Sequence, residues 1–97
     1  MNIALTTIQE KKADIINISQ RYHAENIRIF GSVARGEATE NSDVDFLVSF
    51  QPKASLFDQS GLIEELSILL QRKVDVISER ALSPYSEKVI NDEAMQL

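Results

Sequence analysis

Asp43 and Asp45 are the residues of this sequence whose types and spacing are best suited to chemistry. Across residues 44–50 apolar side chains alternate with other types, a pattern typical of a β-strand. Residues two apart on a strand point to the same side, so both carboxylates should leave one face, which must then meet solvent or a ligand. Two carboxylates held close together repel each other unless a cation lies between them, and Mg²⁺ binds carboxylate oxygens together with substrate phosphates.

Gly31 and Ser32 follow a short β-prone segment, residues 27–30, and precede a helix predicted over residues 32–36. A strand that runs through Gly-Ser into a helix leaves backbone N–H groups at the helix start, where they can bind phosphate. Glycine lets a phosphate approach the backbone closely, and serine adds a hydroxyl donor. By itself, each of these motifs is more often structural than functional. Their order and short separation allow the two motifs to lie side by side on neighbouring strands.

Asp75 is a third candidate carboxylate. It lies within the β-prone segment 73–77, where Val74 and Val76 should face the core and leave Asp75 on the opposite face. If this strand neighbours the strand of residues 44–50, three carboxylates line one patch. Otherwise, Asp75 is an exposed aspartate near the end of a strand.

Arg35 is a candidate for the same site because it follows the Gly-Ser turn by about one helical turn. A guanidinium at this place could reach a phosphate or another part of a substrate. It could equally pair with a nearby carboxylate, and Glu37, Glu40 and Asp43 are the candidates. The sequence leaves both roles open.

The elements that would position these residues follow from periodicity, turn residues and helix caps. We expect helices over residues 4–23, 32–36, 58–71 and 84–95, strands over 27–30, 44–50 and 73–77, and a polar loop over 37–42. This alternation predicts an α/β (α+β) fold with a small β-sheet. A chain of 97 residues suits one small domain, so we expect residues 1–97 to form a single domain.

The composition argues against several classes of protein. The chain has no cysteine and one histidine, so disulfides, thiolate metal sites and histidine-rich zinc sites are not expected. The net charge of −5 and the lack of clustered Lys and Arg argue against direct nucleic-acid binding, while an acidic surface would suit a basic protein partner or Mg²⁺. The sequence shows no membrane-spanning apolar run and no signal peptide, so we expect a cytoplasmic protein.

The segments 31–36 and 42–46, Gly-Ser-Val-Ala-Arg-Gly and Ser-Asp-Val-Asp-Phe, resemble the nucleotidyltransferase superfamily of polymerase-beta type. Their compact form resembles the minimal nucleotidyltransferases, or MNT domains. The likeness extends from Ile27 through the last predicted helix. It implies a small mixed β-sheet with helices packed on one face, and ATP as the substrate.

The resemblance also implies a role for each candidate residue. Gly31 and Ser32 would hold the β- and γ-phosphates of ATP. Asp43 and Asp45 would bind Mg²⁺. Asp75 would be the third carboxylate, which contacts a second metal ion and activates the acceptor hydroxyl. The strand context of Asp75 agrees with this role, although no tight motif surrounds it.

Many MNT proteins are antitoxins encoded beside a HEPN-domain ribonuclease toxin, so the resemblance implies transfer of AMP from ATP to a tyrosine hydroxyl of such a toxin. The chain has no lobe that would select a drug, a tRNA or a primer, which makes a small-molecule transferase the weaker alternative. Another alternative is a non-catalytic antitoxin that neutralises the toxin by binding and occlusion. Three converging carboxylates favour the enzyme, because their repulsion would destabilise a site that binds no cation.

Overall fold

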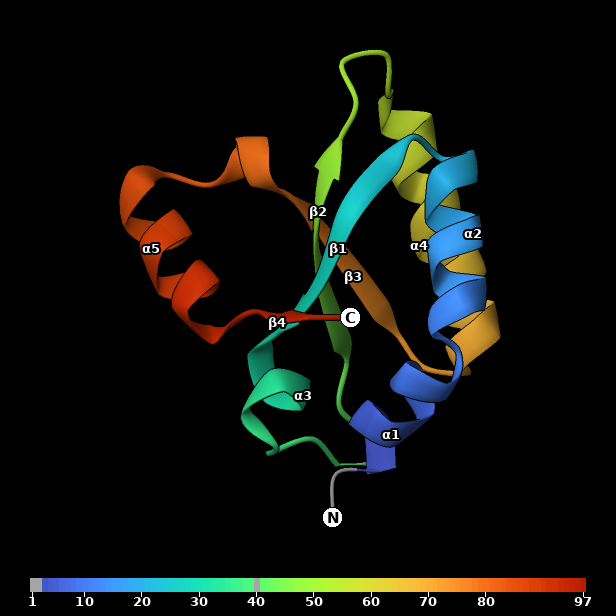
Figure 1. Ribbon diagram of the computed structural model, residues 1–97, viewed down its shortest axis with the longest axis vertical. Helices are drawn as coiled ribbons and strands as arrows, with labels where there is room; N and C mark the ends of the chain where they lie inside the picture. Colours follow the sequence, from blue (N-terminus) through green and yellow to red (C-terminus); the bar gives the residue numbers. More distant parts are fainter. Residues whose placement is uncertain (1–2, 40) are drawn as a thin grey trace.

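The computed structural model describes residues 3–39 and 41–97 of the chain (Figure 1). The helices are α1 (Ile3–Glu10), α2 (Lys12–Arg21), α3 (Gly31–Arg35), α4 (Leu56–Leu70) and α5 (Pro84–Glu93), with a 3-10 turn, η1 (Glu79–Ala81). The strands are β1 (Ala24–Phe30), β2 (Val44–Phe50), β3 (Val74–Ser78) and β4 (Met95–Gln96). No helix within this part of the chain is long and apolar enough to cross a membrane.

The four strands form one mixed sheet in the order β3-β2-β1-β4. β1 pairs antiparallel with both β2 and β4, whereas β2 and β3 run parallel. Parallel strands need a crossover connection, which α4 provides between β2 and β3. The predicted α/β fold with a small mixed sheet is therefore confirmed.

α2 and α4 contact each other and cover one face of the sheet (Figure 1). The hydrophobic core lies between these helices and the strands, and its fully buried side chains include Ile15, Ile29, Phe46, Leu62 and Leu66. Gly61 lies where α4 meets the ring of Tyr22, and a Cβ atom there would come 2.4 Å from Cε1 of that ring. Glycine weakens a helix, but at this position it is needed because α4 packs closely against Tyr22, the residue that follows α2.

The opposite face of the sheet is covered at one end and open at the other. We expected the face that carries the aspartates to be open along the whole of β2, and this was wrong for Leu47, which is fully buried. Arg28 of β1 points to this face, donates to Asn91 of α5 at 3.0 Å and pairs with Glu79 of η1. Arg28 is the strand partner of Leu47, so η1 and α5 are held on the same face as Leu47 through this arginine, and Figure 1 shows α5 across the sheet from α2 and α4.

Several predicted boundaries agree with the structure. β2 begins and ends where its alternation predicted. α3 ends at Gly36, which takes a left-handed conformation with φ of 76°. α4 begins two residues earlier than predicted, because Ser55 and Asp58 form a capping box in which each side chain accepts from the other residue's backbone N–H.

Other boundaries were wrong because of contacts between distant segments. The predicted helix 4–23 is broken at Lys11, where the chain turns so that α1 buries Ile8. β1 begins at Ala24 because this residue pairs with Phe50 of β2. The last helix ends before Ala94, and the residues that follow form β4 at the edge of the sheet.

Candidate active site

Asp45 lies in the middle of the candidate site because of the strand register. It is opposite Phe30, the last residue of β1, and opposite Asp75 of β3. Asp43 precedes β2 and lies two residues from Asp45, so the alternation of the strand directs it to the same side. The structure thus brings Asp75 next to the Asp43–Asp45 pair, which was one of the two arrangements that the sequence allowed.

The electrostatics of Asp45 reflect the charges of the neighbouring carboxylates. Partial burial raises the pKa of Asp45, and the negative charges of Asp75 and Asp43 raise it further, whereas Arg35 lowers it. Ionisation of Asp45 in the folded protein therefore costs free energy, and a nearby cation would reduce this cost.

Gly31 packs directly against this carboxylate. Its φ is 74°, and a Cβ atom at this position would lie 2.5 Å from Oδ2 of Asp45. Both observations require glycine, because other residues rarely adopt a positive φ and no larger residue would leave room for Asp45. α3 begins at Gly31, so the first residue of this helix lies against the Asp45 carboxylate and Ser32 follows it in the first turn.

Arg35 is held by two carboxylates. Its Nε donates to Oε2 of Glu37 at 3.0 Å, and its Nη1 donates to Oε1 of Glu93 at 2.8 Å. Both hydrogen bonds raise the pKa of the Arg35 guanidinium, and the bond to Glu93 has the larger effect. Pairing with Glu37 was one predicted outcome, whereas Glu93 lies in α5 and no local pattern pointed to it. Glu40 lies outside the described residues.

Sequence reasoning missed two basic residues that contact the chain around Asp43. Arg72 donates from Nη1 to the carbonyl oxygen of Thr39 at 2.9 Å and to that of Ser42 at 3.4 Å. Nζ of Lys73 lies 3.9 Å from Oδ2 of Asp43, and both side chains are largely exposed. Arg72 immediately precedes the predicted strand 73–77 and Lys73 is its first residue, but this position did not show which segment the two side chains would meet.

The donors at this site fit a divalent cation by their chemistry. The three aspartates supply only carboxylate oxygens, the ligand type that Mg²⁺ prefers, and their mutual repulsion is reduced by positive charge. Within residues 3–39 and 41–97, however, no three His, Cys, Asp or Glu side chains lie in positions that could hold a metal ion. The residue types therefore suit Mg²⁺, while their present positions do not complete a ligand set.

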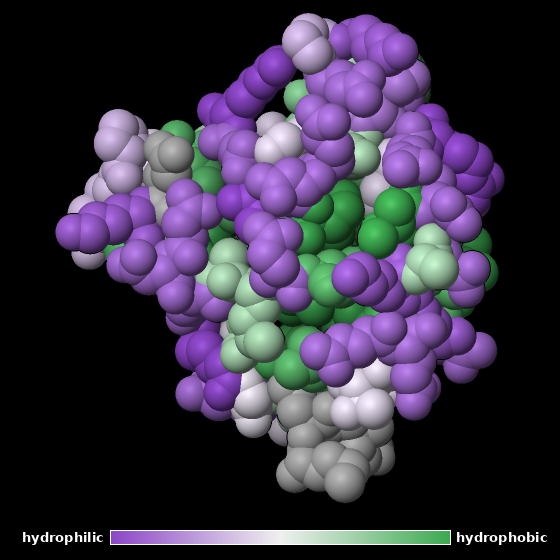
Figure 2. Space-filling view, in the orientation of Figure 1, coloured by the Kyte–Doolittle hydropathy of each residue, from purple (hydrophilic) through white to green (hydrophobic). Residues whose placement is uncertain are grey.

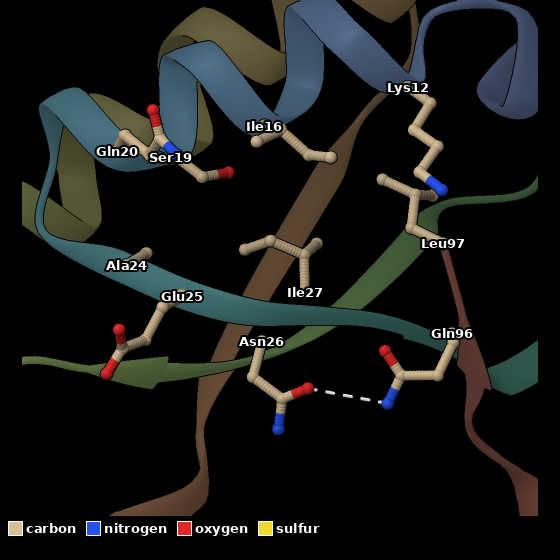
Figure 3. Close-up of a pocket in the computed structure, with 10 residues that line it drawn as sticks. All are labelled: Lys12, Ile16, Ser19, Gln20, Ala24, Glu25, Asn26, Ile27, Gln96 and Leu97. Atoms are coloured by element: carbon tan, nitrogen blue, oxygen red, sulfur yellow. Dashed lines mark hydrogen bonds between the residues drawn. The ribbon is translucent and has the colours of Figure 1, made fainter.

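A cavity of about 310 Å³ lies elsewhere, between α2, the outer edge of β1 and the end of the chain (Figure 3). Ile16, Ile27 and Leu97 contribute apolar surface to it, and Lys12 and Glu25 contribute charged groups. Figure 2 shows apolar side chains surrounded by polar ones in the middle of the face seen in Figure 1. None of the candidate site residues lines this cavity, so it is separate from the carboxylates.

The model of the nucleotidyltransferase domain family matches residues 12–95, a range that contains all the candidate site residues. This chain belongs to the nucleotidyltransferase domain family. Within that family, protein adenylyltransferase MntA of Thermococcus cleftensis is 34% identical over 92 residues, which cover 91% of this chain and 93% of that protein. A Methanocaldococcus jannaschii protein provisionally named a protein adenylyltransferase is 38% identical over 90 residues, covering 93% of this chain and 97% of that protein.

Solved structures agree with this membership. One provisionally described as a minimal nucleotidyltransferase superposes with a TM-score of 0.87 at 40% identity, covering 96% of this chain and 95% of that one. The predicted likeness to minimal nucleotidyltransferases is therefore confirmed. A toxin–antitoxin crystal structure with AMP-PNP has the same fold, with a TM-score of 0.70 at 22% identity, covering 88% of this chain and 70% of that one.

Proposed function

We propose that this chain is a Mg²⁺-dependent protein adenylyltransferase, which transfers AMP from ATP to a tyrosine hydroxyl of a HEPN-domain ribonuclease toxin and thereby neutralises it. The observation that carries the proposal is the alignment of Asp45 with Asp75 across β2 and β3, with Gly31 packed against the Asp45 carboxylate. This arrangement supports a site where carboxylates and the start of a helix meet a nucleotide.

In this proposal Gly31 and Ser32 bind the β- and γ-phosphates of ATP, and Asp43 and Asp45 hold Mg²⁺. Bound Mg²⁺ would supply positive charge that lowers the pKa of the acceptor hydroxyl and neutralises the departing pyrophosphate. The acceptor oxygen forms a bond to the α-phosphorus of ATP. The bond between the α-phosphorus and the α,β-bridging oxygen breaks, and pyrophosphate leaves with that oxygen. Asp75 takes the hydroxyl proton. The backbone N–H of Val76 donates to its Oδ1 at 3.0 Å, which helps to orient this carboxylate.

The protein acceptor is inferred from the relatives. The Thermococcus cleftensis relative is named a protein adenylyltransferase, and the toxin–antitoxin structures share the fold of this chain. The net charge of −5 would favour a basic surface on the toxin. Transfer to a protein also suits the open end of the sheet face, where Asp43 and Asp75 are exposed and accessible to a large acceptor.

A second candidate function is a binding module that neutralises the toxin by occlusion alone. The observation that favours it is the pairing of Arg35 with Glu37 and Glu93, which neutralises a cation that could otherwise bind phosphate. The repulsion among the three carboxylates favours the enzyme instead, because occlusion alone gives no reason to retain a destabilising cluster.

Intact mass spectrometry separates the two functions. The product of the gene that neighbours the gene for this chain is incubated with the purified protein, ATP and Mg²⁺, and addition of whole AMP units to that product supports the transferase. A stable complex without any mass change supports occlusion and contradicts the transferase.

Replacement of the carboxylates assigns the activity to the site. Asp43→Asn and Asp45→Asn should each abolish transfer of labelled AMP. Asp14→Asn, at an exposed position of α2, makes the same change in charge on another surface and should leave transfer intact. Undiminished labelling by Asp43→Asn or Asp45→Asn would show that these residues do not carry the reaction.

A further inference from the structure

Arg72 connects the segment before β3 to the loop that leads into Asp43. It lies between the end of α4 and the start of β3, and its guanidinium reaches across to two backbone carbonyls of that loop. Nη1 donates to the carbonyl oxygens of Thr39, at 2.9 Å, and of Ser42, at 3.4 Å. One side chain therefore bonds to two points of the loop, the second of them immediately before Asp43.

Thr39 and Ser42 of this loop are also hydrogen-bonded to each other. The backbone N–H of Ser42 donates to the carbonyl of Thr39 at 3.1 Å, and that of Thr39 donates to the hydroxyl of Ser42 at 2.8 Å. These bonds join Thr39 to Ser42 but do not attach either residue to the sheet. Arg72 supplies an attachment, because it belongs to a different segment of the chain.

The chain that follows Asp43 is held by Lys73, the residue next to Arg72. The backbone N–H of Val44 donates to the carbonyl of Lys73 at 2.9 Å, which aligns the start of β2 with the start of β3. The ammonium of Lys73 lies 3.9 Å from Asp43, but its side chain is 82% exposed. An exposed ion pair at this distance contributes little, so the backbone contact and the Arg72 guanidinium hold Asp43 from both sides.

We propose that Arg72 is a positioning residue for Asp43. By holding the carbonyls of Thr39 and Ser42, it sets the direction in which the Asp43 carboxylate leaves the chain and keeps it beside Asp45. A guanidinium suits this task because it is planar and presents several N–H donors in fixed directions, whereas the ammonium of lysine is a point charge on a flexible chain. The inference deepens the proposed function and rests on it for the role of Asp43 as a Mg²⁺ ligand.

The first test requires no catalysis. Amide hydrogen exchange is measured by NMR on the full chain without ligands, for the wild type and for Arg72→Lys, Arg72→Ala and Arg21→Ala. We expect exchange at the Ser42 amide to become about tenfold faster in both Arg72 variants, as is typical when a hydrogen bond that orders a segment is lost. The Val48 amide, inside the sheet, should exchange at the wild-type rate. Unchanged exchange at Ser42 in both variants would overturn the proposal.

The second test connects the loop to Mg²⁺. AMP transfer is measured against Mg²⁺ concentration, and Arg72→Lys should need about tenfold more Mg²⁺ for half-maximal activity and approach the wild-type rate when Mg²⁺ is raised. A purely structural role would lower activity without this recovery. Arg21→Ala is the matched control, because Arg21 makes an exposed pair with Glu65 between α2 and α4, and it should not shift the Mg²⁺ requirement.

The outcomes separate the two proposals. Absence of AMP transfer by the wild type would contradict the proposed function, while the exchange measurement would still decide whether Arg72 holds the loop. A wild-type Mg²⁺ requirement and wild-type Ser42 exchange in Arg72→Lys would show that positive charge alone is sufficient, which overturns positioning through the carbonyls. Because Arg72→Lys keeps the charge, it remains informative even where Arg72→Ala is too unstable to study.

Discussion

Gly31 lies so close to Asp45 that a Cβ atom at position 31 would come within 2.5 Å of the Oδ2 atom of this carboxylate. The positive φ of Gly31 adds a second reason for glycine, since L-residues in this conformation are strained by about 1–2 kcal/mol. Gly31→Ala should therefore lower stability modestly and displace Asp45. We expect AMP transfer to fall by about a hundredfold, the effect typical of misplacing a catalytic group by an ångström.

The matched control for this prediction is Gly36→Ala. Gly36 has nearly the same φ, 76°, but nothing lies within 4 Å of a Cβ atom at this position. Denaturant unfolding should show similar losses of stability in the two variants, and only Gly31→Ala should lose transfer. Equal losses of transfer would mean that backbone strain, and not the displacement of Asp45, is responsible.

The pairing of Arg35 with Glu93 should compete with nucleotide binding. Glu93→Gln removes one of the two carboxylates that hold the guanidinium, and an exposed pair of this kind is weak. Titration calorimetry with Mg²⁺ and AMP-PNP should then show binding that is about twofold to threefold tighter, and Arg35→Ala should weaken binding. Asp92→Asn makes the same change in net charge at the adjacent residue. If it tightens binding equally, the effect is a general one of charge and does not depend on Arg35.

The stability of the η1 segment should depend on pH through Glu79. The hydrogen bond from the Ser49 hydroxyl and the pairing with Arg28 lower the pKa of Glu79. A carboxyl whose folded pKa is depressed contributes stability above its unfolded pKa, about 4.3, and loses this contribution as the pH falls through the folded pKa. Glu79→Gln should cost about 1 kcal/mol at pH 7, allowing for partial exposure, and progressively less below about pH 4.

Urea unfolding of the wild type and Glu79→Gln between pH 3 and pH 7 measures this difference. Glu64→Gln, at an exposed position of α4, is the control for a general effect of charge. A stability difference between wild type and Glu79→Gln that stays constant across this range would contradict the expected linkage.

The contact between Gly61 and Tyr22 predicts that Gly61→Ala destabilises the wild-type protein but stabilises a variant that lacks the Tyr22 ring. In the wild type, Gly61→Ala should destabilise the protein by about 1–3 kcal/mol, because the new Cβ would overlap the Tyr22 ring. In a Tyr22→Ala background the same change should stabilise by about 0.5–1 kcal/mol, because alanine is the better helix former. Thermal and denaturant unfolding of the four proteins gives this cycle, and equal effects in both backgrounds would exclude the overlap as the cause.

Local patterns were sufficient to predict the parts of the site that depend on neighbouring residues. The two-residue period placed both ends of β2 and the common direction of Asp43 and Asp45, because this period is a property of any strand. The end of α3 at Gly36 was predictable for a similar reason, since glycine favours the left-handed conformation that ends a helix.

The remaining parts depend on contacts between residues far apart in the chain. The register that brings Asp75 next to Asp45 is set by the packing of whole strands, so the sequence could offer it only as one of two arrangements. Leu47 is buried on a face that the alternation predicted to be open, and on the same face Arg28 bonds to Asn91 of α5, a contact that no periodicity shows.

The sequence by itself determined the α/β fold and the candidate residues of the site, a Gly-Ser turn at the end of one strand and two aspartates on one face of the next. Only the tertiary structure decided which other groups join them. It placed Asp75 beside the pair, connected Arg35 to Glu93 and attached the loop before Asp43 to Arg72. The physical reason is that residue types and short periods are local, whereas these contacts depend on how complete helices and strands pack.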